Sequence, residues 1–403
     1  MKRKPVPVGE LQFGMYVAEL DCPWTDTPFV FQGFCLSTEQ QLQTLRRLCR
    51  YVYVDAARGT PSKAGVASAA GAATPTFAIH GSAAYSAQTE LGHEIELAVK
   101  LHRESLQALA ELLEPLERGA ARLDGREVER VVHDMAESVM RNPDALLVAA
   151  KARQAQAAAH ARAVQVSVYM MAFGRFLQRE PDEIALLGLL GLLQDVGKAR
   201  LPAGLLAREG ALTPEETELV KKHVELSAHI LGVTSGLPIR LPALAMLHHE
   251  RQDGHGYPRG LRGYQIGLFG AIAAICDAYD AELAPPPHGA GRSPGDAVKS
   301  LLRERGSAFH GPLLEQFVRC VGAFPVGSVV ELASGETGVV IGENLLQRLK
   351  PKVLLVNDRA GKRLHSRTVV DLLSDARFRI RRTLDEGAIA LDAASTVQRL
   401  LAA

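Results

Sequence analysis

The sequence predicts a mainly α protein, a helical bundle flanked by a small N-terminal α+β module and a small β-rich C-terminal module. Three observations predict this fold class. Apolar residues recur at three- and four-residue steps over most of residues 81–323, which is the spacing of amphipathic helices. Short runs of β-branched and aromatic residues, punctuated by turn residues, occur in residues 1–57 and 324–403. Residues 58–80 begin with a long run of Ala, Gly, Ser and Pro that has no apolar face, so they predict a flexible linker.

The first module combines strands with one helix. "PVPVGELQFGMYVAEL" and "PFVFQGFCL" predict short strands, because β-branched and aromatic residues alternate with turn residues. "TEQQLQTLRRLCR" has helical periodicity, and "YVYVD" predicts a closing strand. The sequence shows no pocket chemistry here, so it predicts no role for residues 1–57.

The spacing of apolar residues also predicts the helices of the bundle and the strands of the C-terminal module. Helices are predicted over residues 91–117, within 125–177, and over 181–197, 213–232, 241–250 and 267–283, with a further helix pair that ends near Gly322. Thr213 predicts a helix start, with Pro214 in the first turn and Glu216 completing a capping box. After residue 324 the alternation of apolar and polar residues around Gly-rich turns predicts a small β-barrel-like module.

Net charge, cysteine spacing and the length of apolar runs argue against some classes of binding partner and location. The formal net charge is +1, from 46 Lys and Arg against 45 Asp and Glu, which argues against a DNA or RNA polymer as partner. The 5 cysteines lack C-x-x-C spacing, which is typical of a reducing compartment. No apolar run is long enough to span a bilayer and no signal peptide is recognisable, so we expect no membrane partner and a cytoplasmic location.

Several predicted helices carry residues that ligate metals. These residues are His160, Asp195, His223, His248, His249 and Asp277. Each of them alone is more often a surface residue or a satisfied core residue. Together they form an ordered series of imidazoles and carboxylates, the ligands of Fe, Mn or Zn in hydrolytic sites. Since a bundle can project such side chains inward from separate helices, we expect one or two divalent metal ions.

A second motif strengthens this interpretation. "HHERQDGHGYP", residues 248–258, resembles the HHE-x-x-DG-x-GYP pattern of the HD-GYP family of bacterial cyclic di-GMP phosphodiesterases. "DVGKARLPAGLLAREGALTPEE" is similar to another segment of that family. A plain glycine-rich turn would explain Gly254 and Gly256, but not the HHE that precedes them. The resemblance implies an HD-type helical bundle that hydrolyses cyclic di-GMP to pGpG or GMP with the help of metal ions.

The resemblance also implies roles for individual residues. It makes Asp195 and Lys198 catalytic, places Lys198 and Tyr257 against the substrate, and makes Asp195 a bridge between metals. His223, His248 and His249 would complete one metal site, and His160 and Asp277 would belong to the other.

Three departures from the family pattern imply that hydrolysis is weakened or lost. Gln194 stands where the family has the histidine of its His-Asp pair, and an amide oxygen is a weaker ligand than imidazole. Gln156 stands where some members have a glutamate for a third metal, and Pro286 falls where a phosphate-binding arginine is usual. Arg292 is the first arginine downstream of that position.

The sequence leaves alternatives open. The protein is either a weakened phosphodiesterase, or a non-catalytic module that binds the nucleotide or protein partners such as diguanylate cyclase domains through its GYP loop. A metal-stabilised scaffold is a third interpretation. The apolar face of the helix predicted over residues 91–117 either forms a homodimer with a copy of itself or is buried within its own chain.

Overall fold

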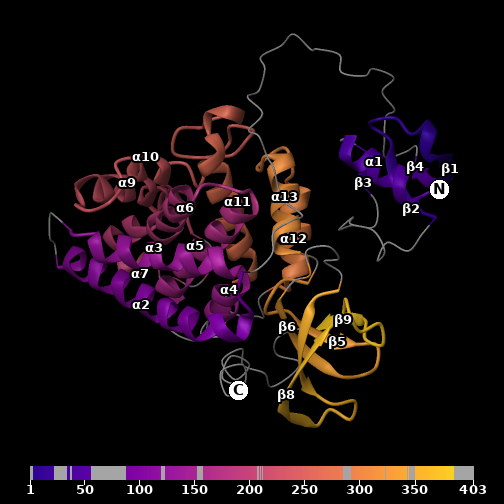
Figure 1. Ribbon diagram of the computed structural model, residues 1–403. Coiled ribbons are helices and arrows are strands. Elements are labelled where there is room, and N and C mark those ends of the chain that lie inside the picture. Colours follow the sequence, from indigo (N-terminus) through magenta and orange to yellow (C-terminus); the bar gives the residue numbers. More distant parts are fainter. Residues whose placement is uncertain are drawn as a thin grey trace. The chain divides into compact units, whose positions relative to one another are not determined.

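The computed structural model confirms a mainly α protein with a small sheet toward each end of the chain (Figure 1). It describes residues 3–21, 34–36, 39–55, 88–118, 123–151, 158–206, 208, 210, 212–284, 292–322, 324–342, 344 and 350–384. The chain forms two compact units. One comprises Met1–Thr74 with Leu346–Leu349, and the other comprises Pro75–Leu345 with Lys350–Ala403. The helical region and the C-terminal sheet therefore belong to the same unit.

The first unit is a four-stranded antiparallel sheet with one helix. Its elements are β1 (Arg3–Pro7), η1 (Val8–Glu10), β2 (Tyr16–Leu20), β3 (Phe34–Cys35), α1 (Glu39–Leu48) and β4 (Tyr51–Asp55). The strand order is β1-β4-β2-β3. Val17, Leu45 and Val52 are fully buried in its core, so the alternating apolar residues do face inward as the pattern predicts.

The second unit begins with the helical bundle. Its elements are α2 (Leu91–Glu117), α3 (Arg126–Arg141), α4 (Pro143–Lys151), α5 (Ala158–Phe176), α6 (Pro181–Leu193), η3 (Val196–Arg200), α7 (Ala203–Leu206), α8 (Pro214–Lys221), α9 (His223–Val233), α10 (Leu241–Ala245), η4 (Gly263–Gln265), α11 (Gly267–Leu283), α12 (Pro294–Arg303) and α13 (Gly311–Val321). The aromatic rings of Tyr169, Phe173, Tyr279 and Phe317 join α5, α11 and α13, with neighbouring centroids 5.2 Å apart. Helix α6 is buried on nearly all sides, which explains why its sequence is apolar without a polar face.

Three predicted helices differ from the structure. The helix predicted over residues 181–197 ends at Leu193, and the 3-10 helix η3 begins at Val196. The helix predicted over residues 213–232 is interrupted at Lys222, between α8 and α9. The helix predicted over residues 241–250 ends at Ala245, and turns follow. The predicted capping box is confirmed, because the Glu216 N–H donates to Thr213 Oγ1 (3.2 Å) and the Thr213 N–H donates to Glu216 Oε2 (2.8 Å).

Helix α2 buries its apolar face within its own chain, against α3 and α4. Glu94 fixes this packing from a buried position. Its carboxylate accepts hydrogen bonds from Ser138 Oγ (2.8 Å) and from the Arg141 guanidinium, with the shortest contact to Arg141 at 2.9 Å. A homodimer through this helix remains a prediction from the sequence.

The C-terminal part forms a five-stranded antiparallel sheet. Its strands are β5 (Val329–Leu332), β6 (Thr337–Gly342), β7 (Lys352–Asn357), β8 (Arg363–Asp371) and β9 (Ile380–Leu384), in the order β8-β7-β6-β5-β9. Val330, Val340 and Val353 are fully buried in the core on one face of this sheet. Among the helices that the structure describes, none combines the length and the apolar character needed to cross a membrane.

Candidate metal centre

Four of the predicted ligands converge inside the bundle. Asp195 follows α6 at the start of η3, His223 is the first residue of α9, and His248 and His249 lie in the turn after α10. One ligand atom from each of the four residues lies within 4.8 Å of the others. The cluster therefore draws its donors from three separate segments, each of which has a fixed backbone.

The backbone fixes the protonation of two imidazoles. Nδ1 of His223 lies 2.7 Å from the carbonyl oxygen of Val220, and Nδ1 of His248 lies 2.7 Å from that of Ala245. A carbonyl oxygen can only accept, so each Nδ1 carries the proton and a neutral ring exposes a lone pair at Nε2. These two Nε2 atoms lie 3.3 Å apart. Two facing lone pairs repel unless a cation or a proton lies between them, so the geometry suits a metal ion.

Asp195 supplies the negative charge of the cluster. Its Oδ1 lies 3.1 Å from His223 Nε2 and 3.6 Å from His248 Nε2, and its Oδ2 accepts a hydrogen bond from Lys198 Nζ at 2.8 Å. Burial alone would raise the pKa of Asp195, but the imidazoles of His223 and His248 and the Lys198 ammonium outweigh it and hold that pKa well below its usual range. An ionised carboxylate beside neutral imidazoles is a donor set that fits a divalent ion.

His249 is the fourth residue of the cluster, and its ring contacts Tyr257 of the GYP loop. Its ring stacks on that of Tyr257, with centroids 4.6 Å apart and planes inclined by 29°. Burial lowers the pKa of His249 to about 2. The ring is therefore neutral near pH 7 and able to ligate. Burial raises the pKa of Tyr257, helped by the negative charge of Asp195, so its hydroxyl keeps its proton.

A close backbone approach brings Asp195 and His223 together. The N–H of Gly197 donates to Ser227 Oγ at 2.8 Å, which ties η3 to α9. A Cβ atom at Gly197 would lie 2.1 Å from the carbonyl oxygen of His223, a distance that no side chain tolerates. Glycine in "DVGK" is therefore required by the contact between η3 and α9.

The glutamate of the HHE motif anchors the GYP loop. Glu250 is 1% exposed, and its carboxylate accepts the backbone N–H groups of Arg259 and Leu261, each at 2.8 Å. At Gly256 a Cβ atom would lie 2.3 Å from the backbone nitrogen of Arg251, so the loop folds tightly back on the motif. Sequence reasoning did not predict this role for Glu250, although its place between two ligands and the glycines was a usable signal.

The other two predicted ligands lie outside the cluster. Among the described residues, the group that could hold a metal includes neither His160 nor Asp277. Asp277 on α11 instead forms an ion pair with Arg162 on α5, with Arg162 Nη2 at 3.1 Å from Asp277 Oδ1. Sequence reasoning missed Arg162, because nothing in "HARAV" indicates a partner more than a hundred residues away. The roles of His160 and Asp277 as ligands remain predictions.

Of the three positions that depart from the family pattern, Gln194 is the one that lies among the described residues. Gln194 is 1% exposed, and its Oε1 is buried without a hydrogen-bond partner. Arg292 forms an ion pair with Glu282 and donates a hydrogen bond to Ser300 Oγ at 3.1 Å, so its side chain is engaged beside α12. Gln156 and Pro286 lie outside the described residues.

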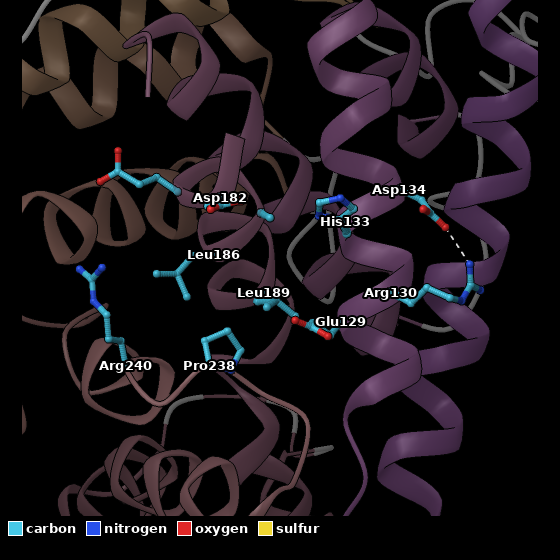
Figure 2. Close-up of a pocket in the computed structure, with 11 residues that line it drawn as sticks. Glu129, Arg130, His133, Asp134, Asp182, Leu186, Leu189, Pro238 and Arg240 are labelled. Carbon is cyan, nitrogen blue, oxygen red and sulfur yellow. Dashed lines mark hydrogen bonds and ion pairs between the residues drawn. The ribbon is translucent and has the colours of Figure 1, made fainter. Parts of the chain in front are cut away.

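A separate pocket opens between α3, α6 and the start of α10, and Figure 2 shows the residues around it. Its volume is about 560 Å³, and none of the four cluster residues lines it. Leu186 and Leu189 give it an apolar wall, while Arg130 on its rim pairs with Asp134 at 2.7 Å. Since its rim charges are of both signs and partly paired with one another, the pocket lacks the convergent donors of the metal cluster.

Comparisons with known proteins agree with this geometry. The HD domain family matches residues 147–313, which include the whole cluster, and a domain family of unknown function matches residues 3–122. A cyclic di-GMP phosphodiesterase of Pseudomonas aeruginosa is 32% identical over 371 residues, which are 92% of this chain and 89% of that protein. A cyclic di-GMP phosphodiesterase of Thermotoga maritima is 34% identical over 128 residues, 32% of this chain and 35% of that protein.

Among solved structures, an HDG"Y"P protein from Bdellovibrio bacteriovorus matches with a TM-score of 0.44 and 16% identity, over 78% of this chain and 98% of that chain. The similarity to the Pseudomonas protein runs through both compact units, so it includes the N-terminal sheet as well as the bundle.

Proposed function

Since this chain belongs to the HD-GYP family of bacterial cyclic di-GMP phosphodiesterases, we propose that it acts in cyclic di-GMP signalling as a metal-dependent phosphodiesterase with weakened hydrolysis. The observation that carries the proposal is the convergence of two imidazole Nε2 atoms and one carboxylate oxygen on a common point. A neutral, purely structural core would not hold these three acceptors together.

The four cluster residues would hold the metal, Fe, Mn or Zn. A bound divalent ion polarises a phosphoryl oxygen and stabilises the charge that develops on it. Asp195 would supply a negative charge to the ion, and the imidazoles of His223, His248 and His249 would supply nitrogen donors. Lys198, which Asp195 holds at 2.8 Å, would present an ammonium group to a substrate phosphate.

Tyr257 would shape the substrate side of the site. Its ring covers His249 and lies under the Lys221 ammonium, which is 5.4 Å from the ring centroid. The phenol is protonated, so it can donate a hydrogen bond to a phosphate oxygen. Binding of the anionic dinucleotide would then rest on Lys198 and Tyr257 next to the metal.

Gln194 is the reason for proposing weakened turnover. Its amide oxygen is a neutral donor where an imidazole would bind more strongly, and it lies buried without a partner next to Asp195 in sequence. A two-ion mechanism loses part of its charge stabilisation when one ion is absent or bound weakly. We therefore expect hydrolysis of cyclic di-GMP to pGpG or GMP at a low rate.

The test is hydrolysis by the full chain loaded with Mn²⁺, with nucleotide products separated by chromatography. We expect slow, metal-dependent formation of pGpG or GMP, which His248→Ala abolishes. His229→Ala is the matched control, because His229 is an exposed histidine on α9 outside the cluster. A metal-loaded wild type that forms no product at high enzyme concentration would exclude catalysis.

A second candidate function is binding of a protein partner without turnover. It is favoured by the rigid GYP loop, whose tip exposes His255 (79% of its side chain) while Glu250 fixes its base. A diguanylate cyclase domain is the partner that the family suggests. Binding of such a purified domain should weaken in His255→Ala and persist in His229→Ala. Equal binding by wild type and both variants would show that the loop is not the contact.

A further inference from the structure

Two buried carboxylates on α11 share one cation from α5. Asp277 and Asp280 are 7% and 5% exposed, and they lie on the same face of α11 because they are three residues apart. Arg162 Nη2 lies 3.1 Å from Asp277 Oδ1, and Arg162 Nε lies 3.1 Å from Asp280 Oδ2. Arg162 also has Nη2 within 3.5 Å of the Asp277 carbonyl oxygen. One guanidinium thus compensates both charges.

The charge of Arg162 also reaches the metal cluster. A guanidinium keeps its charge in proteins, and this charge is attracted by Asp195 as well as by Asp277 and Asp280. Asp195 is the carboxylate of the four-residue cluster, so the guanidinium lies within electrostatic range of the ligand that the family uses to bridge two metals. The position beside Asp277 therefore already contains a positive charge.

The geometry of α5 separates Arg162 from His160. Residues two apart on a helix point about 200° away from each other, since successive residues turn by about 100°. Because Arg162 points toward α11, His160 does not share that direction, and it lies outside the cluster formed by the described residues. His160 therefore lies on another side of α5 than Arg162, and Gln194 supplies only a neutral amide.

We infer that Arg162 takes the place of a second metal ion, so that this chain binds a single divalent ion between Asp195, His223, His248 and His249. The inference rests on the proposed function, because it presupposes the first ion. It deepens that function by making Arg162 a positioning residue that neutralises Asp277 and leaves Asp195 to one metal. It also explains how the chain retains a buried carboxylate at position 277 alongside glutamine at position 194.

The test is the number of metal ions per chain, measured by elemental analysis of full-length protein purified with excess Mn²⁺. We expect one ion in wild type and one in Gln194→His, because restoring the imidazole does not remove the guanidinium. In the double variant Arg162→Ala with Gln194→His we expect two. Arg162→Lys with Gln194→His should stay at one, since it keeps a charge. Arg179→Ala is a control, because Arg179 pairs with its neighbour Glu183 at the start of α6, in a partly exposed position away from the cluster.

The outcomes separate the two proposals. Two ions in wild type or in Gln194→His, or one ion in the double variant with alanine, would overturn the inference about Arg162 and leave the proposed function standing. No ion in wild type would remove the metal centre itself, and with it both proposals. If the double variant with alanine does not fold, the comparison of wild type with Gln194→His still decides, because the inference requires one ion in each.

Thermal unfolding gives an independent readout. Arg162→Ala removes the guanidinium that pairs with the buried carboxylates of Asp277 and Asp280, so the metal-free variant should unfold at a lower temperature than wild type. Added Mn²⁺ should recover more of this loss in the double variant with Gln194→His than in Arg162→Ala alone. Equal recovery in both would contradict the placement of a second ion at this position.

Discussion

The GYP loop should depend on one buried carboxylate. We predict that Glu250→Ala releases the loop that follows His249, because the backbone N–H groups of Arg259 and Leu261 then lose their acceptor. Hydrogen bonds to a charged group contribute about 1.5–3 kcal/mol each, so two of them amount to about 3–6 kcal/mol. Some of this returns when water enters, and we expect a loss of about 3 kcal/mol in the free energy of unfolding. Glu250→Gln keeps one acceptor oxygen and should lose about 1–2 kcal/mol.

The assay combines urea unfolding of the bundle with hydrogen exchange of a peptide from the loop. In Glu250→Ala, the amides of Arg259 and Leu261 should exchange faster than in wild type, and metal affinity should fall because His249 adjoins the loop. Glu225→Ala, an exposed glutamate on α9, is the control and should stay within about 0.5 kcal/mol of wild type. Should Glu250→Ala match that control in both measurements, the anchoring role would be wrong.

Three further changes probe other parts of the structure. Gly197→Ala should weaken metal binding by about 10- to 100-fold in calorimetric titration, because the new Cβ would displace His223, and unchanged affinity would contradict this. Burial lowers the pKa of His310 below its ordinary value of 6.5, and its Nδ1 accepts the N–H of Leu313 at the start of α13 at 3.2 Å. The stability that the neutral ring contributes above about pH 6.5 should therefore be lost as the pH falls. His310→Asn, which can also cap the helix, should reduce the shift in urea midpoint between pH 7 and 5.5, and an equal shift in the variant and wild type would contradict the role of His310. Glu94→Ala should lower the free energy of unfolding by about 2–4 kcal/mol in urea, since it removes the acceptor of the buried Ser138 hydroxyl and the nearest carboxylate of Arg141. A loss below about 1 kcal/mol would show that water replaces these contacts.

Long, regular helices were predictable from the sequence. The spacing of apolar residues placed helices over 91–117 and 267–283, and the structure has α2 and α11 over these same residues. Both are uninterrupted amphipathic or buried segments, where the periodic pattern decides the outcome. The capping box at Thr213 was equally legible, because it depends on residues within one turn.

Breaks near the site were not predictable, for a physical reason. Adjacent residues on a helix point about 100° apart, so His248 and His249 could not both reach one point from a regular helix. The chain leaves the helix at Ala245 and turns, which lets both imidazoles face Asp195. Local periodicity continues through "LHHE" and gives no sign of this turn.

Residue types and the motif resemblance predicted which residues could ligate a metal. They did not predict which of these residues lie close together in the structure. The structure brings together Asp195, His223, His248 and His249, and pairs Asp277 with Arg162. Such pairing depends on how α5 packs against α11. A sequence gives the charges but not which of them meet across a packed helix pair.

The carbonyl groups that hold His223 and His248 belong to the main chain three residues earlier, at Val220 and Ala245. No exchange of side chain at those two positions, short of one that bends the backbone, can take away these restraints. Most substitutions at Val220 and Ala245 should therefore leave the orientation of both rings unchanged. A lineage could alter neighbouring residues, even a ligand such as the one now represented by Gln194, and still inherit a pair of imidazoles directed at the same point.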